Sequence, residues 1–152
     1  MIIDDFLPED DWQTCLDYFK GGNWCFPPLN GEINKTKVWR IFNPLIESHI
    51  GSILYKQLQR LDIQPLAVKR VGINGATTFN ESHIHVDGPL GDYSLIWFGS
   101  TTWDTSWDGN LLVFKDEECW KTHDTTKHPD IIKGVDKIQY VPNRAVLFPA
   151  HL

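Results

Sequence analysis

Three side chains that can bind a divalent metal recur at every second position between residues 82 and 87. They are His83, His85 and Asp87. Because alternate residues of a β-strand point to the same side, a strand over 82–87 would present all three on one face. Imidazole nitrogens and a carboxylate oxygen, with open positions beside them, are typical ligands of non-haem Fe(II) centres. The spacing therefore predicts a strand face that can bind a metal ion.

The same alternation also has a purely structural interpretation. In a half-buried strand, Ile84 and Val86 would fill the core while the histidines stay exposed. A second triplet of the same type, His128-Pro129-Asp130, shows that the pattern is not distinctive by itself. Its proline disfavours a central strand, so we do not expect a metal site there. The residues alone leave both interpretations of 82–87 open.

Composition limits the class of protein. The chain has 152 residues, 41% of them hydrophobic, with seven tryptophans and eight phenylalanines. These values predict one domain with a core or pocket rich in aromatic rings. The net charge of −6 disfavours nucleic acid and anionic lipid as partners.

The cysteine pattern and the lengths of the apolar runs indicate the cellular compartment of the protein. Three cysteines without a CxxC pair are typical of a reducing environment and not of a disulfide framework. No apolar run approaches the ~18 residues needed to span a membrane. Residues 1–5 lack the features of a signal peptide. We therefore expect a cytoplasmic protein without a membrane partner.

Two amphipathic helices and a series of short strands are predicted along the chain. Acidic residues at 9–11 begin a helix with an apolar stripe from Trp12 to Phe19. Asn43-Pro44 precedes a second helix, with a stripe from Ile46 to Leu61. Strands are predicted over 38–42, 66–73, 82–87, 93–99, 110–115, 138–141 and 144–149, and turns at Asn74-Gly75, Gly88–Gly91, Asp108-Gly109 and Pro142-Asn143.

This order of elements predicts a mainly β protein with N-terminal helices, of the α+β class. We expect a single domain over 1–152, in which 1–64 form a helical support and 65–152 the β core. Short strands at close spacing are typical of a sandwich, barrel or jelly roll. Residues 116–136 are polar and mixed, as in a long loop or insert.

Motifs that follow His85-Val86-Asp87 agree in order and spacing with those of a known family. They include W-x-x-x-W-D-G-N-L-L-V-F over 103–114 and P-N-R-A-V-L-F-P over 142–149. The succession resembles the 2-oxoglutarate/Fe(II)-dependent dioxygenases of the prolyl-4-hydroxylase-like group, above all the small forms of phages and marine bacteria. The resemblance covers about residues 70–152, roughly half of the chain.

The resemblance implies a double-stranded β-helix (a jelly roll, cupin-like) that binds Fe(II) and the co-substrate 2-oxoglutarate. His85 and Asp87 match the first two iron ligands of the family. Asn74, Tyr93 and Arg144 match positions on the co-substrate side. The remaining matches are Trp103, Trp107, Gly109, Asn143 and Phe148.

Two features depart from the family pattern. Asp108 stands where the family has the first of two glycines. The family's second ligand histidine lies about six residues after the strand phenylalanine, which here is Phe148, and so falls just past Leu152. The base that pairs with the far carboxylate of 2-oxoglutarate lies further on. We therefore expect a chain truncated at its C-terminus. His151 matches a non-ligand position of the family, and the sequence leaves open whether His83 or His151 takes the place of the missing ligand.

The predicted function is that of an Fe(II)/2-oxoglutarate-dependent oxygenase that hydroxylates a prolyl peptide or a small molecule. An alternative from another class is a catalytically inactive jelly-roll module that binds a sugar or a peptide. A third, cupin-like site would use His83, His85 and Asp87 together. It is disfavoured because three such residues on one strand spread over about 13 Å.

Overall fold

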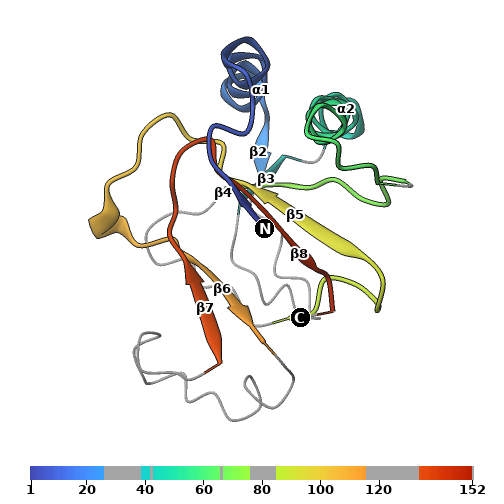
Figure 1. The fold of residues 1–152 in the computed structure, drawn as a ribbon. Coiled ribbons are helices and arrows are strands. Elements are labelled where there is room, and N and C mark those ends of the chain that lie inside the picture. Colours follow the sequence, from blue (N-terminus) through green and yellow to red (C-terminus); the bar gives the residue numbers. More distant parts are fainter. Residues whose placement is uncertain (26–38, 42, 66, 76–84, 116–133, 152) are drawn as a thin grey trace, which may run out of the picture. The chain divides into compact units, whose positions relative to one another are not determined.

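The computed structural model describes residues 1–25, 39–41, 43–65, 67–75, 85–115 and 134–151. His83, Ile84, the triplet 128–130 and most of the predicted loop 116–136 lie outside these residues. The chain divides into two compact units, Phe6–His83 and the combination of Met1–Asp5 with Ile84–Leu152. Antiparallel sheets and two helices make up the described part, which is compatible with the predicted α+β class (Figure 1).

Both predicted helices are present in the unit Phe6–His83. Helix α1 spans Glu9–Gly21 and has three acidic residues in its first turn, where they complement the helix dipole. Helix α2 spans Pro44–Arg60, and the Asn43 side chain accepts hydrogen bonds from backbone N–H groups of its first turn. Neither helix in the described part of the chain is long and apolar enough to cross a membrane.

The apolar stripes of these helices are buried in part, and Leu61 at the end of the second stripe is 41% exposed. Cys15 and Leu16 are the buried residues of α1, and Ile50 and Leu58 are among those of α2. Burial raises the pKa of the Cys15 thiol to about 11, so this cysteine is a neutral core residue at physiological pH. An ion pair between Arg60 Nη1 and Asp11 Oδ2, at 2.8 Å, links the two helices.

A three-stranded sheet completes this unit, with the order β2-β3-β4. Its strands are β2 (Trp24–Cys25), β3 (Trp39–Ile41) and β4 (Ile73–Gly75). The predicted turn at Asn74-Gly75 is wrong, because both residues belong to β4. A Cβ on Gly75 would lie 2.7 Å from the Trp24 ring, so glycine at this position allows that ring to cross the sheet.

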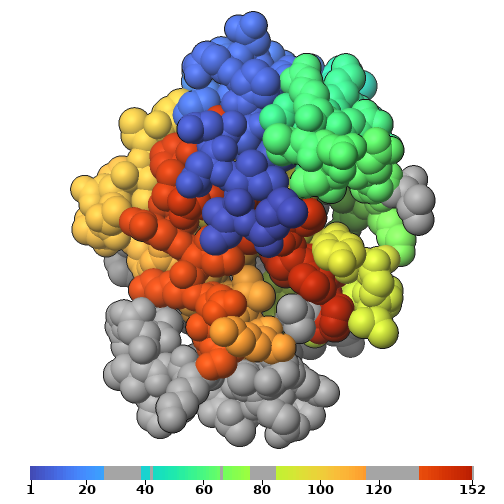
Figure 2. All heavy atoms as spheres, in the orientation of Figure 1, coloured from blue at the N-terminus to red at the C-terminus, as the bar shows by residue number. Residues whose placement is uncertain are grey.

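The second unit is built on a sheet with the order β1-β8-β5. Strand β8 (Ala145–Pro149) lies between β1 (Ile2–Ile3) and β5 (Tyr93–Trp97) and is antiparallel to both. Figure 2 shows the first residues of the chain in blue against the red atoms of β8, in agreement with the pairing of β1 with β8. The strands predicted over 93–99 and 144–149 are therefore confirmed.

Two more strands, β6 (Leu111–Phe114) and β7 (Val135–Ile138), pair antiparallel in the same unit. Strand β6 was predicted, but β7 lies earlier than the expected strand over 138–141. The reason is that β7 carries Asp136 and Lys137 at its centre, both exposed, and Asp136 pairs with Lys115 at 3.0 Å. Because of these two charged residues, the sequence over 135–138 lacks the apolar pattern of a strand, and the segment was predicted as the end of a loop.

Two turns in this unit depend on residues with positive φ. Asn143 has φ +59° and follows Pro142, the positions that a type II turn prefers, and Arg144 N–H donates to the Val141 carbonyl at 3.1 Å. Asn143 is buried, and its side-chain oxygen accepts from Trp97 Nε1 at 3.1 Å. Both predicted turn signals, Pro142-Asn143 and Asp108-Gly109, therefore fall at reversals of the backbone.

The turn at Asp108-Gly109 has a stricter requirement for glycine. Gly109 has φ +75°, and a Cβ there would lie 2.6 Å from Trp103 Cζ2. Asp108 also has positive φ, at +58°. This backbone conformation accounts physically for a preference for glycine at both positions, including the one that Asp108 occupies here.

We expect Gly109→Ala to lower the free energy of unfolding by roughly 2–4 kcal/mol, because it adds both φ strain and an overlap with Trp103. Gly91→Ala is the matched control in the same unit. Gly91 has φ +95° but open space around its Cα, so only the φ strain of about 1–2 kcal/mol applies. Urea denaturation of both variants measures the difference, and equal losses would contradict the packing role of Gly109.

Candidate functional site

His85 and Asp87 lie side by side in the structure. His85 Nε2 is 3.2 Å from Asp87 Oδ1, and the two side chains are 58% and 22% exposed. However, residues 85–87 form no strand, so that part of the predicted strand over 82–87 is wrong. Val86 is 53% exposed, which also contradicts its expected place in the core.

The backbone hydrogen bonds explain why residues 85–87 are not a strand. The N–H groups of Asp87 and Gly88 both donate to the Ala150 carbonyl, each at 2.9 Å. Successive N–H groups of a strand point to opposite sides, so two neighbours cannot share one acceptor in a regular ladder. The histidine and the carboxylate therefore meet through a bend in the chain and not through strand alternation.

A short turn fastens this bend to the end of β8. Asp92 N–H donates to the Pro89 carbonyl at 3.1 Å, and Ala150 N–H donates to the Asp92 carbonyl at 2.9 Å. Strand β5 begins at the next residue and pairs with β8 from Tyr93 opposite Pro149. The backbone that carries His85 and Asp87 is therefore hydrogen-bonded to the end of β8, where β8 pairs with β5.

The separation of the two side chains suits adjacent ligands of one metal ion. Two ligand atoms, each about 2.1 Å from an octahedral ion and at right angles, lie about 3.0 Å apart. The observed distance of 3.2 Å between His85 Nε2 and Asp87 Oδ1 is close to this value. At the same distance, the imidazole and the carboxylate contact each other directly. Imidazole with carboxylate fits Fe(II) chemically as two of its three protein ligands.

A third protein ligand is not found within the described ranges. No group of three histidine, cysteine, aspartate or glutamate side chains there is arranged to hold a metal ion. His151 is exposed at the end of this part of the chain, and His83 lies outside it. The structure therefore places two candidate ligands together and does not add His151 to them.

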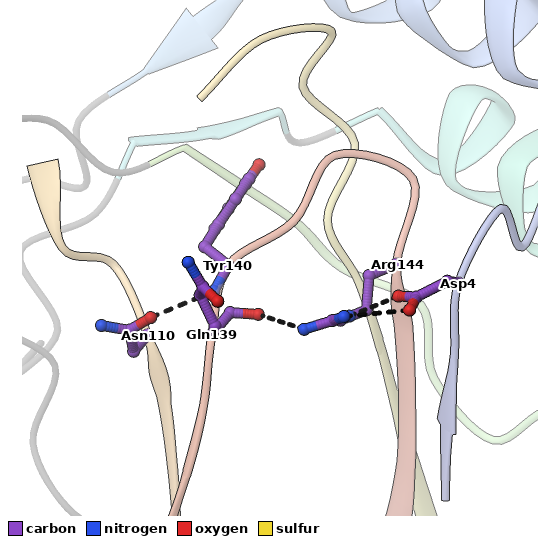
Figure 3. A network of polar contacts seen from close by, with 5 residues as sticks. All are labelled: Asp4, Asn110, Gln139, Tyr140 and Arg144. Carbon is purple, nitrogen blue, oxygen red and sulfur yellow. Dashed lines mark hydrogen bonds and ion pairs between the residues drawn. The ribbon is translucent and has the colours of Figure 1, made fainter. Parts of the chain in front are cut away.

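Arg144 is occupied by partners within its own unit. Its Nε and Nη2 donate to the two carboxylate oxygens of Asp4 at 2.5 and 3.0 Å, and its Nη1 donates to the Gln139 carbonyl at 3.0 Å (Figure 3). This bidentate pair joins the residue after β1 to the residue before β8. A role for Arg144 toward the co-substrate stays a prediction, and its side chain is only 16% exposed.

The ion pair changes the titration of both partners. The hydrogen bonds from Arg144 lower the pKa of the Asp4 carboxyl below its usual value of 3.8. The same hydrogen bonds raise the pKa of the Arg144 guanidinium. Asp4 is therefore ionised, and the pair intact, at neutral pH.

The other two residues predicted for the co-substrate lie in different units. Tyr93 is 68% exposed at the start of β5. Asn74 is exposed in β4, where its Cα partner across the sheet is Arg40 of β3. Their predicted roles stay predictions.

Aromatic rings stack in series around Tyr140. The Tyr140 ring stacks on Phe98 at 4.4 Å and on Trp103 at 3.9 Å between centroids, and Trp103 meets Trp107 edge to face at 5.4 Å. Tyr140 N–H donates to the Asn110 side chain at 3.1 Å, and its hydroxyl donates to Ser100 Oγ at 2.9 Å. These contacts define how the rings lie relative to one another, whereas the sequence motif gives only their order along the chain.

A cavity of about 270 Å³ lies beside this stack. Its lining combines the two rings with polar side chains, namely Trp103, Thr105, Asp108, Asn110, Lys137, Gln139 and Tyr140. Sequence reasoning singled out Trp103 but missed Tyr140 and Asn110. Tyr140 stands directly before the Val141–Arg144 turn, but nothing in the spacing shows that its ring would reach Trp103.

No protein-family model matches the chain, and no curated protein matches it in sequence. Function is therefore inferred from the residues and their geometry.

We expect Asp4→Asn to lower the free energy of unfolding by about 1 kcal/mol at neutral pH, because Arg144 loses its charged partner. Since folding lowers the pKa of Asp4, the pair stabilises the fold fully above pH 3.8 and progressively less as the pH falls through the lowered pKa. The difference between wild type and variant should therefore shrink in acid.

Urea denaturation at pH 7 and at pH 3 measures this dependence. Asp5→Asn, which removes the same charge one residue further along, is the control and should change stability little at either pH. A wild-type-to-variant difference that is the same at both pH values would contradict the assigned ion pair.

Proposed function

We propose that the chain is an Fe(II)/2-oxoglutarate-dependent oxygenase built on a double-stranded β-helix. The observation that carries this proposal is the adjacency of His85 Nε2 and Asp87 Oδ1, at 3.2 Å, on backbone tied to the β5–β8 pairing. The order of motifs from His85 to Phe148 supports it. The proposed substrate is a prolyl peptide or a small molecule.

In this proposal, His85 and Asp87 supply two protein ligands to Fe(II). When bound, iron together with 2-oxoglutarate and O₂ supplies the oxidising chemistry that hydroxylates a C–H bond of the substrate. The chain's part is to fix the positions of its two ligands and to keep Asp87 largely shielded from solvent. The shared hydrogen bonds to the Ala150 carbonyl perform the first task, because they hold the backbone of Asp87 and Gly88.

Two protein ligands alone bind Fe(II) weakly, so we expect weak but specific binding by the 152-residue chain. Under anaerobic conditions, Fe(II) with 2-oxoglutarate should give a visible charge-transfer band. His85→Ala and Asp87→Ala should each weaken Fe(II) binding at least about tenfold, since even the loss of a supporting residue at metal sites has effects of this size.

His49→Ala is the control for the loss of a histidine, because His49 lies on α2 and contacts Tyr18. It should leave the absorbance titration unchanged. Wild-type Fe(II) affinity in both His85→Ala and Asp87→Ala would refute the proposed centre.

The cavity beside Tyr140 favours a second candidate, a module that binds a sugar without redox chemistry. Sugars bind against aromatic rings with polar groups at the edge, and this cavity pairs Trp103 and Tyr140 with amide, carboxylate and ammonium side chains. Trp107, 62% exposed, extends the aromatic surface next to Trp103. This candidate needs neither His85 nor Asp87.

If the cavity binds sugars, glucose, galactose or mannose should change the tryptophan fluorescence in a saturable way without metal. Gln139→Ala removes a polar group from the lining and should weaken the response severalfold, through loss of a hydrogen bond. Gln13→Ala on α1 is the matched control and should leave it unchanged. A linear, unsaturable response to all three sugars would exclude this function for them.

A further inference from the structure

The backbone of Asp108 has a conformation that is costly for an L-residue. Directly after the 3₁₀ helix Thr105–Trp107, Asp108 has φ +58° and ψ −120°. Positive φ with such a ψ is normally restricted to glycine, because a Cβ crowds the neighbouring peptide groups. In an L-residue, Cβ is rotated by about 120° from the backbone nitrogen around the Cα–C bond. At the observed ψ, the Cβ of Asp108 is therefore eclipsed with the nitrogen of Gly109.

This eclipsed arrangement brings together two groups that can react. An aspartate carboxyl and the N–H of the next residue can close a five-membered ring only when Cβ and that nitrogen lie on the same side of the Cα–C bond. The Asp108 side chain is exposed, and Asn110 Nδ2 donates to its Oδ1, so the carboxyl lies toward the residues that follow. Gly109 has no side chain that could hinder the attack. Asp108 and Gly109 thus form a near-attack arrangement.

Trp103 holds this backbone in place. Its Nε1 donates to the Asp108 carbonyl at 2.9 Å, which fixes the plane of the peptide between Asp108 and Gly109. The Trp103 ring also lies against Gly109, where a Cβ would be 2.6 Å from Cζ2. On the other side, Asp108 N–H donates to the Thr105 carbonyl at 3.3 Å. The eclipsed ψ is therefore a property of the folded chain and not of the dipeptide.

A second Asp-Gly pair in the chain, Asp87-Gly88, is held differently. Gly88 N–H donates to the Ala150 carbonyl at 2.9 Å, and Asp87 Oδ1 lies 3.2 Å from His85 Nε2. Both groups that would have to react in this pair are therefore bound to other partners. Gly109 N–H, by contrast, has no hydrogen-bond acceptor among the residues that the structure describes. The two pairs thus have the same sequence and a different readiness to react.

We propose that Asp108 is a site of spontaneous covalent modification, at which the chain isomerises to isoaspartate. The Gly109 nitrogen bonds to Asp108 Cγ, the Cγ–OH bond breaks, and the hydroxyl leaves as water with the proton of the N–H. One water molecule then opens the resulting succinimide ring. Addition at Cγ restores aspartate, whereas addition at the main-chain carbonyl carbon leaves a chain that runs through Cβ and Cγ. No oxidant, metal or second substrate takes part.

Isomerisation changes the cavity beside Tyr140, because Asp108 is part of its lining. The isoaspartate backbone is longer by one methylene group. The bond from Trp103 Nε1 to the Asp108 carbonyl and the close packing of Trp103 on Gly109 therefore cannot both persist. Since Trp103 stacks on Tyr140, the modification makes the shape of this cavity depend on the age of the molecule.

The test is prolonged incubation of the folded, metal-free full chain in mild acid, where the carboxyl carries the proton that leaves with water. A protease that cleaves before aspartate but not before isoaspartate reports both Asp-Gly pairs in one digest. Cleavage before Asp108 should be lost at least about tenfold faster than cleavage before Asp87, because only Asp108 is held for attack. In urea the two rates should become alike, since both pairs are then unfolded.

Two tryptophan variants separate the effect of the held backbone from that of exposure. Trp103→Phe keeps a ring against Gly109 but loses the bond to the Asp108 carbonyl, so isomerisation should slow severalfold. Trp24→Phe is the matched control, because Trp24 Nε1 likewise donates to a backbone carbonyl, that of Phe19. It should leave the rate at Asp108 unchanged.

The proposal is overturned if residue 108 of the folded chain isomerises no faster than residue 87, if it isomerises no faster in the folded chain than in urea, or if Trp103→Phe isomerises at the wild-type rate. The first two comparisons use the wild-type chain alone, so they decide the question even if Trp103→Phe does not fold. No measurement involves iron or a sugar, so either proposed function can fail without affecting the result.

Discussion

The pairing of β8 on both of its edges is the constraint on which the unit Met1–Asp5 with Ile84–Leu152 depends. Strand β5 pairs with β8 along its whole length, whereas β1 pairs with Ala145 and Val146 alone, which are buried where both neighbours meet the strand. The register with β5 then fixes where the chain leaves each end of β8. Arg144 at one end bonds to Asp4, and Ala150 at the other end bonds to Asp87 and Gly88.

The two ends of β8 serve different tasks. Before the strand, Arg144 pairs with Asp4, and the Val141–Arg144 turn directly follows Tyr140, whose ring stacks with Phe98 and Trp103. After it, the Ala150 carbonyl takes two successive N–H groups and so bends the segment that carries His85 and Asp87. The adjacency of the His85 and Asp87 side chains therefore depends on backbone hydrogen bonds.

Much of the fold could be predicted because local sequence patterns fixed it. The stripes of α1 and α2, the acidic first turn, the Asn43 cap and the apolar runs of β5, β6 and β8 each act over a few residues. The errors arose where contacts between distant residues decided the outcome. Asn74-Gly75 reads as a turn, yet it is a strand because it pairs with Trp39 and Arg40 of β3. In β7, charged residues with exposed side chains hid a strand that pairs with β6.

The sequence by itself determined the chemical groups of the candidate site and their order, since His85 and Asp87 and the motifs after them can be read directly. It also determined the helices and the strand that anchors the second unit. Only the tertiary structure decided that His85 and Asp87 meet through a bend and not along a strand, and that Arg144 is paired with Asp4. The physical reason is that hydrogen-bond partners more than a hundred residues apart, or on neighbouring strands, leave no periodic trace in the sequence.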